Sequence, residues 1–200
     1  MTDHQHQLYA VNFKEADQVR LIGFSCGDEI WSRHVAEWIR GSDVLDSMKK
    51  GTKVWLFENA SGEIVGFGSV GRTRWRWPLR DGAYNTILLL PMLGLATRFQ
   101  GQPPEPEWRF ARQIMSHLIH AAREMSEATA QSASPIDWLV LMVHRDNLRA
   151  VKFYQLRFRV DPRCIAARGP SRNEALDRRN CGLRAVHCPA RMSSPCFGAS

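Results

Sequence analysis

The stretch TILLLPMLGLATRFQGQ, residues 86–102, is the most informative part of the chain. Residues 86–95 form an apolar run that predicts a buried strand, although Pro91 within it is more typical of an edge or a bulge. A glycine-containing turn and then a helix follow, an order that brings backbone N–H groups to a helix N-terminus and favours an anion such as phosphate. The turn matches neither the GxxxxGKS/T loop nor the GxGxxG fingerprint, so its local chemistry leaves phosphate binding open.

The surrounding pattern indicates an α/β domain. Strands are predicted over residues 53–57, 63–70, 86–95 and 138–143, with one more over either 8–13 or 18–24. Helices are predicted over residues 30–39, 44–48, 108–122 and 147–155, and loops over 101–106 and 126–135. A meander followed by strand–helix–strand–helix predicts a mixed sheet.

A second segment, WLVLMVHRDNLRAVKFY at residues 138–154, adds a strand, an asparagine and an aromatic-ending helix. Together with the first segment it resembles the GCN5-related N-acetyltransferase (GNAT) family over roughly residues 8–162. The residues that carry the resemblance are Leu93-Gly94-Leu95, Gln100-Gly101-Gln102 and the pattern Asn147-x-x-Ala150-x-x-Phe153-Tyr154. The start Phe24-x-Cys26-Gly27, followed by a helix, also looks like that of many GNAT proteins, including toxins that acetylate tRNA.

The resemblance implies a GNAT-like mixed, mostly antiparallel sheet flanked by helices, in which two strands splay into a V-shaped gap for acetyl-CoA. The strand backbone around Leu95 would pair with the pantetheine arm, loop amides would cradle the pyrophosphate, and Asn147 would bind the pantetheine arm. The cofactor-binding residues implied in this way are Leu95, Gln100, Gly101, Gln102 and Asn147.

The resemblance also implies the chemistry. Tyr154 would protonate the leaving CoA thiolate, a role that suits a tyrosine because its phenol is neutral at working pH and can donate a proton. The acetyl group would pass directly from acetyl-CoA to a primary amine on a small molecule or a peptide. The residues alone leave a second interpretation of Tyr154 open, that of a core aromatic at the end of a helix. Asn147 could likewise cap that helix, and both of its roles are compatible.

Two departures from the family pattern motivate another interpretation. Pro103 and Pro104 stand in the loop and remove two amide donors, so the pyrophosphate would be held by fewer amides, with help from Arg98 or Arg109. The Gly-Phe pair that usually follows the tyrosine helix is missing after Tyr154. A non-catalytic GNAT-like binding module is therefore an alternative to an enzyme.

The run RTRWRW at residues 72–77 alternates Arg with Thr or Trp, so an extended chain would place Arg on one face and Trp on the other. Charge and stacking of this kind suit a nucleic acid. With the FxCG start, the run motivates a toxin-like acetyltransferase of aminoacyl-tRNA as a further alternative. The competing interpretation is a half-buried strand with a solvated Arg face.

The remaining reactive groups suit structural roles. No acidic residue falls within residues 86–95, so a water relay or an amine that arrives deprotonated would replace a general base. No metal site is predicted, because His117 and His120 have no third ligand nearby in sequence. Cys26 has no identifiable base and is typical of a small packed residue. Three acidic residues elsewhere could contribute to general-base catalysis, although each is more typical of a solvated turn or strand position: Glu58, Glu63 and Asp81.

The net charge of +7 lies mostly at the end of the chain. Seven of the 27 basic residues but two of the 20 acidic residues lie at 163–200, which leaves 20 basic and 18 acidic residues before that segment. Four of the five cysteines lie there too, at spacings that match no paired zinc motif. We therefore expect an acetyltransferase domain over 1–162 and a basic, poorly ordered tail over 163–200, and we treat the charge as weak evidence for tRNA.

The chain shows no sign of export or membrane insertion. MTDHQHQ at the N-terminus lacks the basic and apolar regions of a signal peptide, and the longest apolar stretch, residues 87–96, is half of the ~20 residues that a bilayer needs. These features predict a cytoplasmic protein with reduced thiols and no membrane partner. A homodimer is compatible with the sequence, which carries no direct signal for one.

Overall fold

The computed structural model of the 200-residue chain describes residues 7–76, 84–101, 109–130, 136, 138–144, 146–158 and 183–189. The chain divides into two compact units. Unit 1 comprises Met1–Gly71 and Leu90–Ala121, and unit 2 comprises Arg72–Leu89 and Ala122–Ser200.

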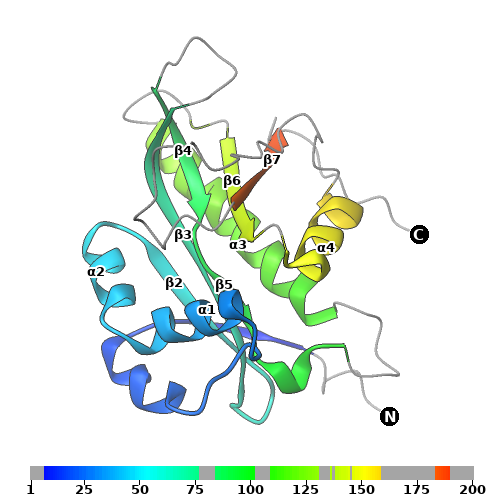
Figure 1. Cartoon of the computed structure of the whole chain (residues 1–200). Coiled ribbons are helices and arrows are strands. Elements are labelled where there is room, and N and C mark those ends of the chain that lie inside the picture. The colour runs from blue at the N-terminus through cyan, green and yellow to red at the C-terminus, as the bar shows by residue number, and fades with distance from the viewer. Residues whose placement is uncertain are drawn as a thin grey trace, which may run out of the picture. The chain divides into compact units, whose positions relative to one another are not determined.

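Unit 1 is built on antiparallel strands in the order β1-β2-β3, with β5 also paired antiparallel to β3 (Figure 1). The sheet opens with the first of the two candidate segments, and the second is helical. The elements of this unit are β1 (Tyr9–Asn12), the 3-10 helix η2 (Glu15–Leu21), α1 (Ile30–Arg40), α2 (Asp43–Lys49), β2 (Lys53–Glu58), β3 (Ile64–Arg76), β5 (Leu93–Leu95), the 3-10 helix η3 (Thr97–Phe99) and α3 (Arg109–Ala130). The last parts of β3 and α3 belong to unit 2.

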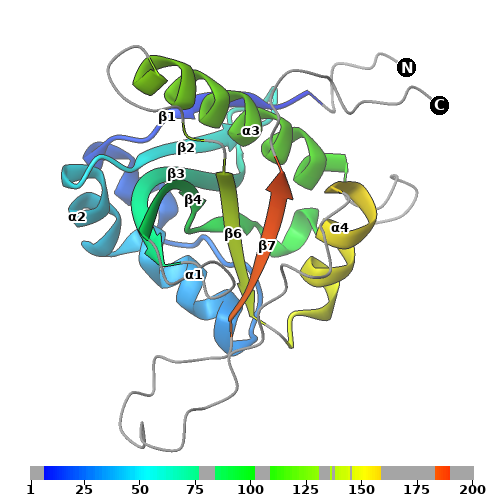
Figure 2. The ribbon, with the colours of Figure 1, turned by 90° about the horizontal axis from the view of Figure 1, so that it is seen from above.

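Glycines on β3 allow α3 to approach the sheet closely. A Cβ atom on Gly66 would lie 2.9 Å from Ile114 Cδ1, and one on Gly68 would lie 2.6 Å from Leu118 Cδ1. On the opposite face, Phe67 packs against Trp38 of α1 with ring centroids 6.0 Å apart. The two faces of this sheet are therefore covered by α3 on one side and by α1 and α2 on the other (Figure 2).

Unit 2 continues the strand order from the end of β3 through β4 and β6 to β7. Strands β6 and β7 are antiparallel and pair along their whole length, from Trp138 opposite Pro189 to His144 opposite Leu183 (Figure 2). The elements of this unit are β4 (Tyr84–Leu90), β6 (Trp138–His144), α4 (Leu148–Phe158) and β7 (Leu183–Pro189). The mixed α/β class and the mostly antiparallel sheet predicted from the sequence are confirmed.

Three predicted element bounds are wrong. The single strand over 86–95 is two strands, because Pro91 has no N–H to continue the ladder. Helix α3 continues through residues 126–130, which were expected to be loop. Its small polar side chains are satisfied there, since the Thr129 hydroxyl donates to Met125 O at 2.8 Å and the buried Ser126 hydroxyl donates to Ile136 O at 2.8 Å. A strand predicted to start at Phe158 is also wrong at that residue, which ends α4.

Strand β7 lies within the segment 163–200 that the sequence-based boundary leaves outside the domain. The rest of that segment lies outside the described residues, and the division at residue 162 stays a prediction. Among the helices that the structure describes, none combines the length and the apolar character needed to cross a bilayer.

Candidate functional site

Strand β5 pairs with β3 along one side, and the backbone groups along its other side form the candidate site in unit 1. Gly66, Phe67 and Gly68 of β3 lie opposite Leu95, Gly94 and Leu93. Hydrogen bonds flank these pairs on both sides, from Ala96 N to Val65 O at 2.9 Å and from Ser69 N to Met92 O at 3.0 Å. They show which opposite residues of the two strands are hydrogen-bonded pairs and which are non-bonded pairs.

Because antiparallel pairs alternate between bonded and non-bonded positions, Leu93 and Leu95 direct their N–H and C=O groups away from β3. We call these backbone groups the outer edge of β5. In the described part of the chain, the only strand that pairs with β5 is β3. An extended molecule that carries amides can pair with such an edge as an added strand would.

Ser69 holds the break between β4 and β5. Its hydroxyl accepts a hydrogen bond from Met92 N at 3.2 Å and donates one to Met92 O at 3.1 Å, and the residue is fully buried. These bonds give Met92 N its partner beside Pro91 and add a second donor to Met92 O, which also accepts from Ser69 N. The outer edge of β5 is thus held in register from its first residue.

Leu95 and Gln100, two of the predicted site residues, are in direct contact. The side-chain Nε2 of Gln100 donates to Leu95 O at 2.6 Å and to Cys26 O at 2.9 Å. The backbone N–H of Gln100, which the sequence analysis assigned to the pyrophosphate, donates to Thr97 O at 3.1 Å. Gly101 has φ of 68°, a left-handed conformation that favours glycine. Gln102 lies outside the described residues, as do Pro103 and Pro104.

The segment around Cys26 is fastened to the same turn. Thr97 donates its N–H and its hydroxyl to Ser25 O, at 2.9 and 3.1 Å. A Cβ atom on Gly94 would lie 2.8 Å from Cys26 Sγ, so only glycine fits beneath the thiol. This contact of Cys26 with Gly94 of β5 was not predicted from the sequence, because no local pattern signals a contact between residues about 70 positions apart.

Burial raises the pKa of Cys26 to about 12, and the Arg40 guanidinium and the Leu95 N–H oppose that shift. The thiol is therefore protonated at neutral pH. A neutral, buried thiol suits the packing role that the sequence favoured over a nucleophile.

Asn147 caps α4. Its side-chain Oδ1 accepts from Ala150 N at 3.1 Å, and its own carbonyl accepts the first helical bond from Val151 N at 3.0 Å. The cap role that the sequence analysis left open is confirmed. The cap uses the amide oxygen, whereas the amide Nδ2 is a donor suited to a carbonyl acceptor.

Tyr154 lies about two helical turns after Asn147 on the same helix. Its side chain is buried, and its ring lies 5.1 Å from that of Phe153 between centroids. Burial raises the pKa of Tyr154, so the phenol stays protonated throughout the neutral range. The burial of the side chain agrees with the core-aromatic interpretation, and the proton-donor role stays a prediction.

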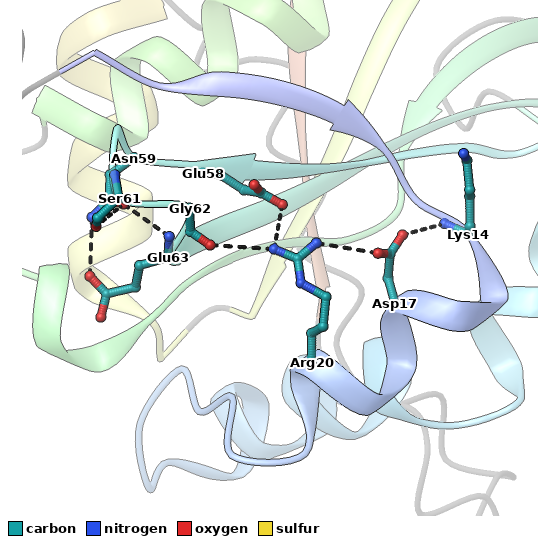
Figure 3. A network of polar contacts seen from close by, with 8 residues as sticks. All are labelled: Lys14, Asp17, Arg20, Glu58, Asn59, Ser61, Gly62 and Glu63. Carbon is teal, nitrogen blue, oxygen red and sulfur yellow. Dashed lines mark hydrogen bonds and ion pairs between the residues drawn. The ribbon is translucent and has the colours of Figure 1, made fainter.

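The two glutamates of the β2–β3 hairpin are engaged in ion pairs, and Figure 3 shows the pair of Glu58 with Arg20. Arg20 contacts Glu58 at 2.7 Å, and Arg98 contacts Glu63 at 2.6 Å. Asn59 organises the turn, since its Oδ1 accepts from Ser61 N and Glu63 N. These contacts favour structural roles for both glutamates, and they occupy Arg98, which was a candidate for the pyrophosphate. Asp81 lies outside the described residues.

Two further observations concern metal and nucleic acid. Within the described ranges, no group of three or more His, Cys, Asp or Glu side chains is arranged to hold a metal ion. Arg72 and Arg74 are exposed and lie on one face of β3, as the alternating run predicts. The side chains of Trp75 and Trp77 lie outside the described part of the chain.

Comparison with solved structures identifies proteins of the same fold. A tyrosine-to-phenylalanine variant of the AtaT toxin, bound to the C-terminus of the antitoxin AtaR and acetyl-CoA, is 14% identical with a TM-score of 0.57, over 90% of this chain and 93% of that chain. AtaT complexed with acetyl-methionyl-tRNAfMet is 16% identical with a TM-score of 0.56, over 93% and 96% of the two chains. A variant of KacT is 13% identical with a TM-score of 0.58, over 91% and 95%.

These likenesses show the fold, and they confirm the GNAT-like architecture expected from the sequence. No protein-family profile matches the chain, and no curated protein sequence matches it either.

Proposed function

We propose that this protein is an acetyl-CoA-dependent N-acetyltransferase. The observation that carries the proposal is the outer edge of β5, where Leu93 and Leu95 direct backbone donors and acceptors away from β3. The pantetheine arm of acetyl-CoA carries two amides and suits pairing with such an edge. The GNAT fold, shared with an AtaT structure that contains acetyl-CoA, supports the same substrate.

The proposed reaction is direct acyl transfer. A neutral amine attacks the thioester carbonyl, the C–N bond forms, the C–S bond breaks and the CoA thiolate leaves. Tyr154 donates its phenolic proton to the thiolate and then regains a proton from the solvent, and the raised pKa keeps the phenol protonated before the transfer. A backbone N–H of β5 stabilises the oxyanion. Because Glu58 and Glu63 are held in ion pairs, water or the solvent takes the proton from the amine.

Acetyl-CoA binding is the first test of the proposal. A ligand that binds the native state raises the melting temperature, so acetyl-CoA at a hundredfold excess over its dissociation constant is expected to add about 2.7 kcal/mol of stability. Differential scanning fluorimetry with acetyl-CoA, and with adenosine as a control, measures the shift. No shift at millimolar acetyl-CoA would remove the proposed substrate and favour a binding module that has lost its ligand.

A second candidate concerns the acceptor. Arg72 and Arg74 present two exposed cations on one strand face, which favours a polyanionic acceptor over a free amine. Together with the tRNA complex of AtaT, this observation supports an aminoacyl-tRNA as the acceptor.

Release of CoA measured with charged tRNA, uncharged tRNA, polyamines, amino acids and a peptide decides among acceptors. Turnover with charged tRNA that falls steeply as salt rises supports the tRNA candidate. Equal turnover with free amines rejects it.

A further inference from the structure

The side-chain amide of Gln100 occupies the outer edge of β5. A primary amide carries two N–H hydrogens, and Nε2 of Gln100 donates to two carbonyls, Leu95 O at 2.6 Å and Cys26 O at 2.9 Å. Leu95 O is one of the groups that point away from β3. The acceptor that an added chain would use at this point is therefore already paired within the protein.

We propose that the Gln100 side chain is a placeholder: in the free protein its amide donates to Leu95 O, and when acetyl-CoA binds, an N–H of the pantetheine arm takes its place. This inference rests on the function proposed above. It assigns Gln100 a role through its side chain, in contrast to the backbone role that the sequence resemblance implies.

The contacts around Gln100 suit a side chain that moves while its backbone stays. Its N–H donates to Thr97 O, and Thr97 is in turn fastened to Ser25 O by two hydrogen bonds of 2.9 and 3.1 Å. The turn is thus held without the Gln100 side chain, whose rotation breaks only the bonds to Leu95 and Cys26.

The other backbone polar group of Leu95, its N–H, has a weak hydrogen-bond partner. The Leu95 N–H contacts the Cys26 thiol, and sulfur is a weak acceptor. A carbonyl on the pantetheine arm is a stronger acceptor for that N–H. A half-buried carbonyl without a donor costs free energy, which explains why the free protein keeps a donor on Leu95 O.

Gln100→Met keeps the length of the side chain and removes the donor. If Gln100 is a placeholder, this variant is less stable than wild type and yet binds acetyl-CoA more tightly. The free variant is expected to melt at a lower temperature than wild type, because Leu95 O and Cys26 O lose their partner. Acetyl-CoA is expected to bind about fivefold more tightly, because it no longer has to break a bond worth about 1 kcal/mol. Isothermal titration calorimetry measures the affinity of both proteins.

Thr97→Val is the matched control. It removes the hydroxyl bond to Ser25 O from the same turn and leaves Leu95 O paired, so its affinity for acetyl-CoA is expected to stay within about twofold of wild type. Equal or weaker binding by Gln100→Met overturns the placeholder and makes Gln100 a clamp needed in the bound state. If wild type and variant both fail to bind acetyl-CoA, the proposed function falls and takes this inference with it.

A measurement on wild type checks the inference without a mutation. The side-chain amide hydrogens of Gln100, followed by NMR, are expected to exchange slowly with water in the free protein and faster in the presence of saturating acetyl-CoA. Slow exchange in both states, with binding established, overturns the placeholder.

Discussion

Gln100 and Asn147 show how the same side-chain chemistry serves two different ends. Both carry a primary amide and both were assigned to acetyl-CoA from the sequence. Asn147 uses its Oδ1 to accept from Ala150 N in its own helix, whereas Gln100 uses its Nε2 to reach Leu95 and Cys26. The asparagine cap follows from local sequence, because its partner lies three residues away. The glutamine contact to Cys26 crosses 74 residues and no local pattern contains it.

Tyr154→Phe tests the proposed proton donor at the scale of one oxygen atom. Phenylalanine fills the same space, so the fold and the affinity for acetyl-CoA are expected to stay unchanged, while kcat falls by roughly 100-fold as general acid catalysis is lost. Tyr9→Phe is the matched control, because it makes the same chemical change at an exposed residue of β1, a strand that pairs with β2 and not with β5. Steady-state turnover with each acceptor measures the effect. A kcat within twofold of wild type would assign Tyr154 to the core alone.

Strand β5 is the element on which the proposed site depends. Its neighbouring residues predict an extended segment, but they do not predict which strand that segment pairs with. The apolar run predicts a single strand over residues 86–95 and does not separate residues 93–95 from the rest. Pro91 predicts an interruption without deciding whether the chain pairs again afterwards. Pairing resumes because Ser69 satisfies both backbone groups of Met92 from the neighbouring strand.

Ser69→Ala tests this dependence. The change removes the partner of Met92 N and one of the two donors to Met92 O next to the fully buried Ser69 position, so the free energy of unfolding is expected to fall by about 1–3 kcal/mol. The affinity for acetyl-CoA is expected to weaken as well, because the outer edge of β5 loses its anchor. Urea denaturation and calorimetry measure the two effects.

Ser47→Ala is the control for Ser69→Ala. Its hydroxyl also donates to a backbone carbonyl, Asp43 O at 2.8 Å, but that hydrogen bond is exposed and lies within α2. An unfolding midpoint for Ser69→Ala equal to that of this control would show that the hydroxyl does not hold β5.

At the scale of the whole chain, the excess of positive charge and the last strand lie in the same segment. Residues 163–200 carry seven arginines and two acidic residues, a composition that predicts poor order. Within it, residues 183–189 form β7 and pair with all seven residues of β6. Composition describes the average of a segment, and it misses a short run such as LRAVHCP, whose pairing partners lie about 40 to 50 residues away.

Truncation after residue 162 measures what β7 contributes. Removal of the strand exposes one edge of β6, so the melting temperature is expected to fall by at least about 5 °C, which corresponds to the loss of about 2 kcal/mol in a chain of this size. A chain that ends at residue 189 keeps β7 and serves as the control. If the chain that ends at residue 162 melts at the temperature of the full chain, the boundary predicted from the sequence is correct.

The sequence by itself determined the kind and order of most elements, because the hydrophobic period of a helix or a strand is written within a dozen neighbouring residues. Its family resemblance also predicted the GNAT-like fold, and it offered the cap at Asn147 as one of two compatible roles. Tertiary structure alone decided which backbone groups of β5 face away from β3, which carbonyls Gln100 holds, and that β6 gains a partner from the basic segment. Each of these depends on the register between residues far apart in the chain, and hydrogen bonds across that distance are set by packing rather than by local propensity.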